Sequence, residues 1–587
     1  MPRARTAFLA AALALTCALL SAAARQGDSG AAIPSGNGTP GGRVQGPGGR
    51  FGGPVRDNAD QPPGTASIRG RILSSDTGTP VRRAQVRAVS NELRTARLAS
   101  TDAEGRFELK DLPAGRWNLT ASKAGFVTLQ YGQTRPFESG RAVELTDNQT
   151  LTRVDFTLPR GSAITGHVYD EFGDPVAGAR VQVLRFQTIQ GTRRVTPSGT
   201  GDQSDDTGAF RLYGLSPGEY FVSATLRAGP GADNTDGTSY APTFYPGTGN
   251  LAEAQRLTLT VGQEQSSINF ALLPVRTVRV SGLVLGASGT PLGNAVVTLA
   301  SGADTSAAFN MTTAAGRTRP DGTFSLGNVS PGSYTLTATT GFGGGRGGNN
   351  ASFEIAALPV IVGNDDLTGV TVLTSKGGSI TGRLAAAEGS SGQLRTGNVQ
   401  VVAQTVRFEA GPGAGARPAR VESDGTFRLT GLMGPRVLRV NGLPQEWMLK
   451  AVMLNGTDVT DATFDFKGNE DLSGAQILVT DRVSEVNGKV TLNNQPTRDF
   501  TVVIFPDDPA KWEYPSRYIR SGRGDEQGQF RIRPLPAEQR YLAIAVDYLE
   551  DGEATDPQFL EQMADRATRF GLIEGESKAL DLKLIQR

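Results

Sequence analysis

Apolar and polar residues alternate along most of this chain in short runs, and one such run returns five times. Its form is apolar-x-Gly-x-apolar, as in residues 68–72, Ile-Arg-Gly-Arg-Ile. A period of two is typical of a strand that buries one face. Because a glycine inside a strand lets another backbone or a bulky neighbour approach closely, we expect such an approach at each copy. The central glycines are Gly70, Gly166, Gly282, Gly382 and Gly488.

The second recurring element is a tight turn, Gly-x-Phe, followed by another alternating strand. The pairs Asp321-Gly322 and Asp424-Gly425 predict hairpin turns in which glycine takes a positive φ. The phenylalanine two residues after each glycine then faces the interior. The five pairs are Gly105 and Phe107, Gly208 and Phe210, Gly322 and Phe324, Gly425 and Phe427, and Gly528 and Phe530.

The third element, Leu-x-Pro-Gly-x-aromatic, reverses the chain and returns a bulky ring. Trp117, Tyr220 and Tyr334 are these rings in the first three copies, and the last two copies keep only part of the pattern. The repeat spans about a hundred residues, the size of a self-contained domain. Short strands at this spacing, without helical periodicity between them, predict a Greek-key β-sandwich.

The predicted fold class is therefore all-β, a tandem array of about five Greek-key β-sandwich modules with one short C-terminal helix. Asp556-Pro557 is the expected cap of that helix. Its apolar face consists of Phe559, Leu560, Met563 and Ala567. The predicted domains are a signal peptide at 1–24, a disordered Gly/Pro-rich linker at 25–65, and modules at 67–160, 163–274, 278–375, 379–481 and 484–587.

The first residues predict export. Arg3 and Arg5 precede an apolar run at 7–20 and a small-residue cleavage site at 21–24. The single cysteine, Cys17, lies inside this segment, so cleavage leaves a chain with no thiol. The alternatives are a retained signal anchor and lipidation at Cys17. We expect an extracytoplasmic location (periplasm, cell surface or medium) with no transmembrane segment after cleavage.

Charge and residue inventory exclude several functions. The 59 Lys and Arg residues nearly balance 58 Asp and Glu residues, for a net charge of +1, so nucleic acid is not an expected partner. The one histidine, His167, cannot supply a zinc peptidase site, which takes at least two. Acids beside the turns, such as Asp102 and Asp205, are interpreted as turn formers. We predict no catalytic, cofactor-binding or metal-binding residues, and no cofactor.

Two short motifs are interpreted as structural. The glycine-rich segment 341–348 lacks the Gly-Lys-Ser/Thr ending of a phosphate loop and is expected to be a surface loop. The tripeptide Arg523-Gly524-Asp525 matches a cell-adhesion motif by letters, in a turn region where glycine and aspartate are common.

A Gly-x-Pro turn follows the opening strand in the first three copies, at residues 78–80, 173–175 and 289–291. Together, the glycine-centred strand, the Gly-x-Pro and Gly-x-Phe turns and the Leu-x-Pro-Gly-x-Tyr element resemble the carboxypeptidase regulatory-like domain. The resemblance implies a transthyretin-like β-sandwich of the carbohydrate-binding-like group, in a secreted bacterial multi-domain protein. It is to the accessory domain and not to the peptidase. Modules one to three carry every element, and modules four and five carry part of them.

Aromatic residues in two loops are the candidate ligand-binding sites, because exposed rings stack on sugars. They are Tyr240, Phe244, Tyr245, Trp512 and Tyr514. The alternative is that these rings pack at sandwich ends or between modules. The predicted function is a non-catalytic extracytoplasmic binding or spacer array, with polysaccharide as the leading partner. The alternative is a structural or protein-docking component of the cell envelope. The oligomeric state stays open.

Overall fold

The structure is a computed structural model that describes residues 64–90, 95–226, 238–301, 312–340, 353–406, 417–525 and 527–587. The chain divides into two units, Met1–Gln45 and Gly46–Arg587, and every described residue belongs to the second. The predicted signal peptide, the linker up to residue 63 and the glycine-rich segment 341–348 lie outside the described residues.

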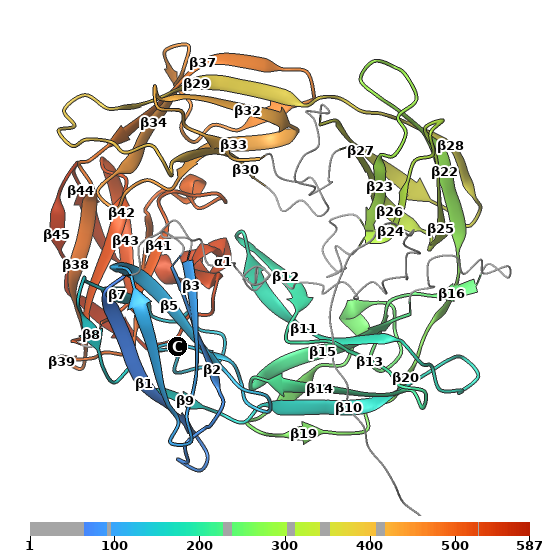
Figure 1. The fold of residues 1–587 in the computed structure, drawn as a ribbon, viewed down its shortest axis with the longest axis horizontal. Coiled ribbons are helices and arrows are strands. Elements are labelled where there is room, and N and C mark those ends of the chain that lie inside the picture. The colour runs from blue at the N-terminus through green and yellow to red at the C-terminus, as the bar shows by residue number, and fades with distance from the viewer. Residues whose placement is uncertain are drawn as a thin grey trace, which may run out of the picture. The chain divides into compact units, whose positions relative to one another are not determined.

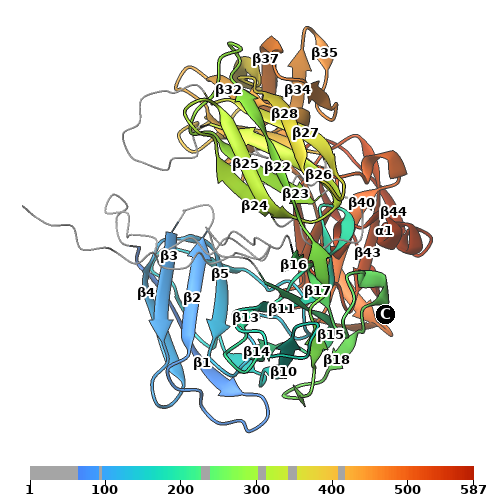
Figure 2. The ribbon, with the colours of Figure 1, turned by 90° about the vertical axis from the view of Figure 1, so that its right-hand side faces the viewer.

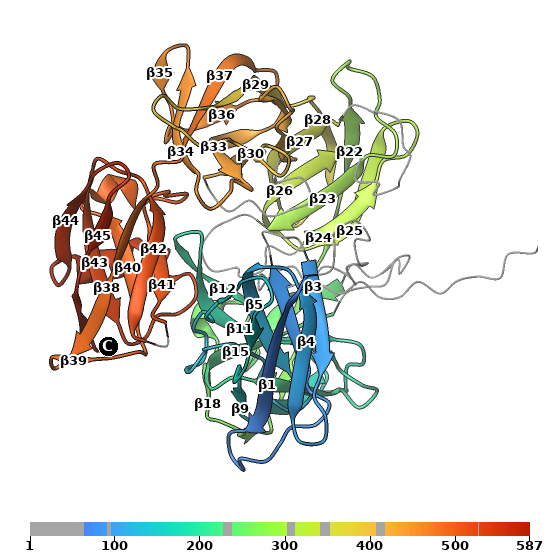
Figure 3. The same cartoon turned by 60° about the vertical axis from the view of Figure 1, so that its left-hand side comes forward.

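The predicted all-β fold class is confirmed. Strands form five successive groups, which we number modules 1 to 5, and each group encloses a hydrophobic core of its own (Figure 1). The two layers of module 3 can be followed in Figure 2, and the strands of module 5 in Figure 3. The modules comprise β1–β9, β10–β21, β22–β28, β29–β37 and β38–β46.

One sheet of every module is built around the glycine-centred strand. These opening strands are β1 (Ala66–Ser74), β10 (Ser162–Tyr169), β22 (Val278–Leu285), β29 (Gly378–Ala386) and β38 (Ser484–Leu492). Each pairs antiparallel with the strand that carries the Gly-x-Phe phenylalanine, namely β4 (Arg106–Leu112), β14 (Ala209–Leu215), β25 (Thr323–Val329), β32 (Thr426–Leu432) and β42 (Gln529–Leu535). On its other side each pairs parallel with the last strands of the module, which are β8 (Thr150–Leu151) and β9 (Phe156–Leu158), β19 (Glu264–Gln265) and β20 (Phe270–Ala271), β28 (Leu367–Leu373), β37 (Asp471–Thr480), and β45 (Ser577–Ala579) and β46 (Leu582–Ile585).

The expected close approach at the opening-strand glycines is confirmed in all five modules. A Cβ placed on Gly166 would lie 1.9 Å from the carbonyl oxygen of Ile268, in the parallel chain segment. The corresponding distance is 1.9 Å at Gly70 and Gly282 and 2.0 Å at Gly382 and Gly488. No side chain fits at that separation, so the parallel segment can lie against the opening strand only where glycine stands.

We expect Gly282→Ala to destabilise module 3 by about 1–3 kcal/mol, because its methyl group would collide with the carbonyl oxygen of Val370. Gly327→Ala is the matched control, since a Cβ at Gly327, in β25 of the same module, meets nothing within 4 Å. Hydrogen exchange measured over β22 and β28 would show the loss of protection. Equal exchange in the two variants would contradict the steric explanation.

The second sheet carries the returning ring as the third residue of a central strand. Tyr220 in β15 (Gly218–Thr225) and Tyr334 in β26 (Gly332–Thr339) are buried, and each hydroxyl donates to a backbone carbonyl four residues earlier at 2.7 Å. In module 5 the same position of β43 (Gln539–Val546) holds Tyr541. In module 4 the third residue of β33 (Gly434–Asn441) is a buried arginine, Arg436, whose Nε donates to the carbonyl of Met433 at 2.7 Å.

The turn glycines and the phenylalanines behave as predicted. Gly322 and Gly425 have φ values of 79° and 86°, in the left-handed region that favours glycine. Asp102 and Asp205 accept hydrogen bonds from backbone amides within their own turns, which supports their interpretation as turn formers. The five phenylalanines of the motif are buried in their cores; they are Phe107, Phe210, Phe324, Phe427 and Phe530.

The predicted helix is present as α1 (Pro557–Ala564), the one α-helix among the described residues. The side chain of Asp556 caps it by accepting from the amide of Gln558 at 2.9 Å. Its buried face, formed by Phe559, Leu560 and Met563, covers the outer side of β40 (Thr501–Pro506) and β43 in module 5, whose strands β46 joins into one sheet. Module 5 therefore has a second, smaller core outside the sandwich. No helix in the described part of the chain is long and apolar enough to cross a membrane.

Candidate functional site

The structure places two of the five predicted aromatic residues in cores. Phe244, in β17 (Thr243–Phe244), is 4% exposed and packs with Phe221 and Leu251 on the outer side of the second sheet of module 2. Trp512 is 7% exposed, and its ring lies edge-on to that of Phe505 with ring centroids 5.7 Å apart. Its Nε1 donates a hydrogen bond to the carbonyl of Pro506 at 2.7 Å. Both rings lack a free face for stacking on a sugar.

The other three predicted rings are half-buried and have protein partners. Tyr240 donates to Glu171 at 2.6 Å, and this hydrogen bond raises the pKa of Tyr240 to about 12. Tyr245 lies edge-on to Phe270 with ring centroids 6.1 Å apart. The hydroxyl of Tyr514 accepts a hydrogen bond from Gln404, which lies in β30 (Gln400–Thr405) of module 4. These surroundings favour packing within and between modules.

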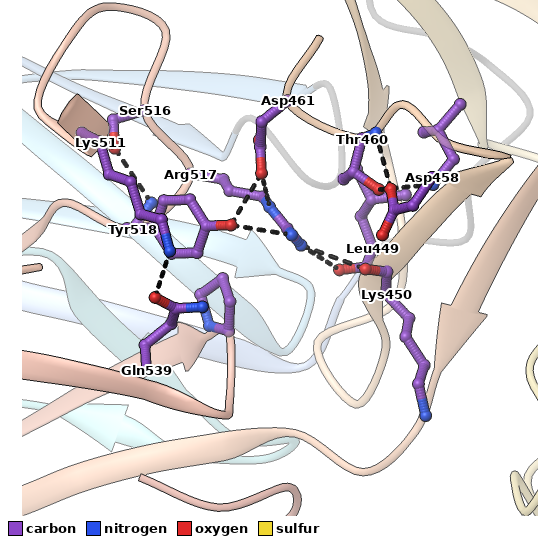
Figure 4. Close-up of polar contacts among 12 residues, drawn as sticks. Leu449, Lys450, Asp458, Thr460, Asp461, Lys511, Ser516, Arg517, Tyr518 and Gln539 are labelled. Carbon is purple, nitrogen blue, oxygen red and sulfur yellow. Dashed lines mark hydrogen bonds and ion pairs between the residues drawn. The ribbon is translucent and has the colours of Figure 1, made fainter. Parts of the chain in front are cut away.

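Close to Tyr514 in the chain, Arg517 and Tyr518 enter a polar joint between modules 4 and 5 that is centred on Asp461 (Figure 4). The Asp461 carboxylate accepts from Arg517 Nε at 3.1 Å and from the Tyr518 hydroxyl at 2.7 Å, both in module 5. It also accepts from Arg439 of its own module at 3.1 Å. We call this set the Asp461 joint. One carboxylate thus gathers three donors from two modules.

Backbone carbonyls complete the Asp461 joint. Arg517 donates across the boundary to the carbonyl of Lys450 at 3.2 Å, and Arg439 donates to that of Pro515 at 2.9 Å. Burial lowers the pKa of the Arg439 guanidinium and raises the pKa of Tyr518 to about 12, with Asp461 adding to the latter. The Tyr518 hydroxyl therefore remains a donor throughout the neutral range. Beside the joint, Lys450 pairs with Glu574 at 2.8 Å.

A second set of contacts forms around residues 134–139 of module 1, which we call the Phe137 loop. It lies between β6 (Leu129–Gln130) and β7 (Val143–Leu145). Phe137 packs edge-on against Tyr220 of module 2, with ring centroids 6.4 Å apart. Arg185, in β11 (Arg180–Ile189) of module 2, lies 3.6 Å above the Phe137 ring and forms an ion pair with Glu550 of module 5. Modules 1, 2 and 5 therefore meet at this loop.

The next residue of the loop, Glu138, forms a buried ion pair with module 5. Its carboxylate lies 2.9 Å from Nη1 of Arg523, and the two side chains are only 4% and 6% exposed. Glu138 also accepts from the backbone amide of Arg135 at 3.0 Å, and Arg523 has a second acidic partner in Asp499. Two charges removed from water to this extent are stable only as a hydrogen-bonded pair.

Further contacts join the Phe137 loop to residues 547–551 of module 5. Arg135 pairs with Asp547 at 3.3 Å, and the Tyr548 hydroxyl donates to the carbonyl of Pro136 at 3.0 Å. The amide of Asp551 donates to the carbonyl of Phe137 at 2.9 Å. Burial raises the pKa of Tyr548, which keeps its hydroxyl a donor. The contact thus combines backbone, aromatic and charged groups.

Sequence reasoning did not single out Glu138, Arg185 or Asp461. Arg523 was noticed only as the first letter of the adhesion-like tripeptide. Its burial against Glu138 leaves no exposed arginine there for a receptor, while Asp525 forms a turn by accepting from the amides of Gln527 and Gln529. The sequence offers one signal for these contacts, which is the presence of arginine and acidic residues close together in a loop, such as Arg135 and Glu138.

The described residues include no group of three or more His, Cys, Asp or Glu side chains placed to hold a metal ion. His167 stacks on Tyr169, at 6.1 Å between centroids, on the opening strand of module 2.

Comparison with known proteins supports the domain type. Residues 67–159 match the family model of the carboxypeptidase regulatory-like domain, so module 1 is a domain of this kind. A search of the curated proteins found no match.

Solved structures with similarity to this chain include two pilins and a third bacterial protein. The Bacillus anthracis TIE protein is 16% identical, with 53% of this chain and 51% of that chain covered and a TM-score of 0.15. The present chain therefore matches about half the length of that protein. A streptococcal ancillary pilin (13% identity, 52% and 98% covered, TM-score 0.19) and BcpA, the major pilin subunit of Bacillus cereus (11%, 53% and 99%, 0.13), also match. TM-scores this low carry no argument about function.

Proposed function

We propose that this protein is a non-catalytic extracytoplasmic spacer, a structural or protein-docking component of a bacterial cell envelope whose modules are fixed to one another. The observation that carries the proposal is the buried Glu138–Arg523 pair between modules 1 and 5. An ion pair with both side chains this buried demands a defined geometry, because a shift that separates the charges leaves each unsolvated. The Asp461 joint supplies a second fixed boundary.

The location outside the cytoplasm rests on the signal-like segment at 1–24, and the absence of catalysis rests on the residue inventory. Hydrogen bonds, ion pairs and packed rings hold two of the boundaries between modules. Such boundaries suit a spacer, which keeps the parts attached to it at a fixed distance. Polysaccharide binding is the finer proposal. Two places on the protein are candidates for binding a glycan: the half-buried rings of Tyr240 and Tyr245, and the charged cleft described below. Binding at either place would distinguish this function from a purely structural role.

We expect spin labels on module 4 and module 5, at Lys467→Cys and Lys583→Cys, to give one narrow distance distribution. Both lysines are exposed, and Cys17 is the only native cysteine in the chain. Asp461→Ala should broaden that distribution, because Arg439 and Arg517 lose their shared carboxylate at a cost of about 1–2 kcal/mol. Electron–electron distance measurements on the full chain provide the readout.

Asp465→Ala is the matched control, since it removes another exposed carboxylate of module 4, one that makes no ion pair with the described residues. It should leave the distribution unchanged. A broad distribution in the parent protein would contradict a fixed spacer, and an unchanged one in Asp461→Ala would remove the Asp461 joint from the proposal.

A further inference from the structure

Modules 1 and 5 enclose a cleft of about 1330 Å³ beside the Phe137 loop. Its walls contain seven cationic and five acidic side chains, together with several glycines. The volume exceeds that of ordinary small-molecule pockets, which extend to roughly 1,000 Å³. An extended ligand fits such a space better than a single small ion does.

Five of the cationic residues in the cleft make no ion pair with the described residues. Arg116 and Arg141 belong to module 1, and Lys489, Arg520 and Arg533 belong to module 5. Arg116, Lys489 and Arg533 are exposed, and the side-chain contact of Arg533 is with the neutral Gln445 at 3.1 Å. The remaining two cations, Arg523 and Arg531, are paired with Glu138 and Glu485.

The acidic residues of the cleft are mostly engaged with other groups. Glu550 pairs with Arg185, and Asp551 accepts from the Ser139 hydroxyl at 2.9 Å. Asp525 and Asp581 accept backbone amides at 2.8 Å and 3.1 Å. Only Glu144, across the strand pair from Arg116, has no such partner. These carboxylates keep their charge, but seven cationic side chains outnumber five acidic ones, so the residues that line the cleft carry a net positive charge.

Two half-buried arginines of the cleft, Arg141 and Arg520, have no acidic partner among the described residues. Arg141 has its Nε buried without a hydrogen-bond partner. Arg520 donates from Nη1 to its neighbouring carbonyl, of Ile519, at 2.9 Å, and burial lowers the pKa of its guanidinium. A bound anion would satisfy the free donors and offset that desolvation.

We propose that this cleft binds a carboxylated polysaccharide, a polyuronate, along the cationic residues of its two walls. Guanidinium groups bind carboxylates through two parallel hydrogen bonds, and a polyuronate presents carboxylates at regular intervals. Charged side chains and glycine dominate the walls, which suits a ligand rich in hydroxyl groups. An acidic peptide would draw its affinity from large apolar anchors, and the large apolar side chains beside this cleft, such as Phe530 and Leu549, are buried in the module cores.

The proposal rests on the proposed function, because the cleft exists only while module 5 is docked on module 1. Isothermal titration of the full chain with hexagalacturonate at about 0.15 M salt is the first test, with a neutral hexasaccharide and hexaglutamate as comparison ligands. We expect the uronate alone to bind. Hexaglutamate binding as tight as hexagalacturonate binding would overturn the choice of ligand, and no uronate binding by a docked protein would overturn the site.

The triple variant Arg116→Gln, Lys489→Gln, Arg533→Gln removes three exposed charges from the cleft and should weaken uronate binding about tenfold or more. The control variant Arg82→Gln, Arg279→Gln, Arg428→Gln removes the same charge from exposed arginines outside the cleft. It should bind like the parent. Equal weakening in both variants, or unchanged binding in the first, would contradict the assignment.

Docking is followed separately through hydrogen exchange of the Asp551 amide, which bonds to the Phe137 carbonyl. Protection that persists in the triple variant while binding is lost places the failure in the cleft. Protection that is absent from the parent protein contradicts the docked arrangement and with it the proposed function.

Discussion

Arg523→Met is expected to separate module 5 from module 1, because it leaves Glu138 buried without its cationic partner. Removing one member of a buried pair costs about 3–5 kcal/mol. Opening the contact lets water reach the Glu138 carboxylate, although the remaining contacts of the Phe137 loop are lost. We expect this loss to cost less free energy than keeping an unpaired carboxylate buried, so the two modules should separate. Hydrogen exchange over 134–139 and 547–551 should rise sharply, while the cores of both modules stay protected.

Glu138→Gln combined with Arg523→Met supplies the control for that result. The amide of glutamine still accepts from the Arg135 backbone, and no unpaired charge remains in the contact. The double variant should therefore recover part of the protection that Arg523→Met loses. If the double variant is at least as open as Arg523→Met alone, the effect comes from lost packing and not from a stranded charge.

The docking of module 5 on module 1 also withdraws the arginine of the adhesion-like tripeptide from solvent. Arg523 is available to solvent only when its pair with Glu138 is broken, and the adjoining Gly524 lies against the ring of Phe500, 2.4 Å from a Cβ placed there. The same residues that resemble an exposed motif by letters are thus part of the contact that fixes the spacer.

The repeated core of each module could be predicted from sequence because its signals are local. Alternation around Gly70 identifies a strand, and the turn at Gly322 requires a positive φ that glycine accommodates. The phenylalanine two residues later must then face inward. Even the worn copy in module 5 keeps a ring in the returning position, as Tyr541, although the spacing of its motif differs.

The contacts between modules could not be predicted because nothing periodic marks them. Glu138 and Arg523 are 385 residues apart, the first in a loop and the second at the end of β41 (Arg520–Arg523), and neither segment carries a sequence motif for the other. The sequence identifies the aromatic loops. It does not reveal that in modules 2 and 5 these loops fold back over the outer side of a sheet of their own module. Phe244 and Trp512 fill those second cores, so an apparent surface feature is interior.

Phe107→Ala is expected to unfold module 1 within the intact chain. Phe107 is 4% exposed and packs against Phe156, with ring centroids 6.2 Å apart, beneath the glycine at position 70. Truncating a buried phenylalanine to alanine costs about 3–5 kcal/mol, which is comparable to the whole stability of a small domain. Urea titration followed by hydrogen exchange should show module 1 losing protection at a lower concentration than module 3.

The consequence reaches beyond module 1, because the Phe137 loop is held by the strands on either side of it. Once module 1 unfolds, Arg523 loses Glu138 and the contact with module 5 opens at the same urea concentration. Phe107→Leu keeps a large apolar side chain and should cost less, so that module 1 and the contact persist together to a higher concentration. If the contact stayed protected after module 1 had unfolded in Phe107→Ala, the Phe137 loop would not be what fixes module 5.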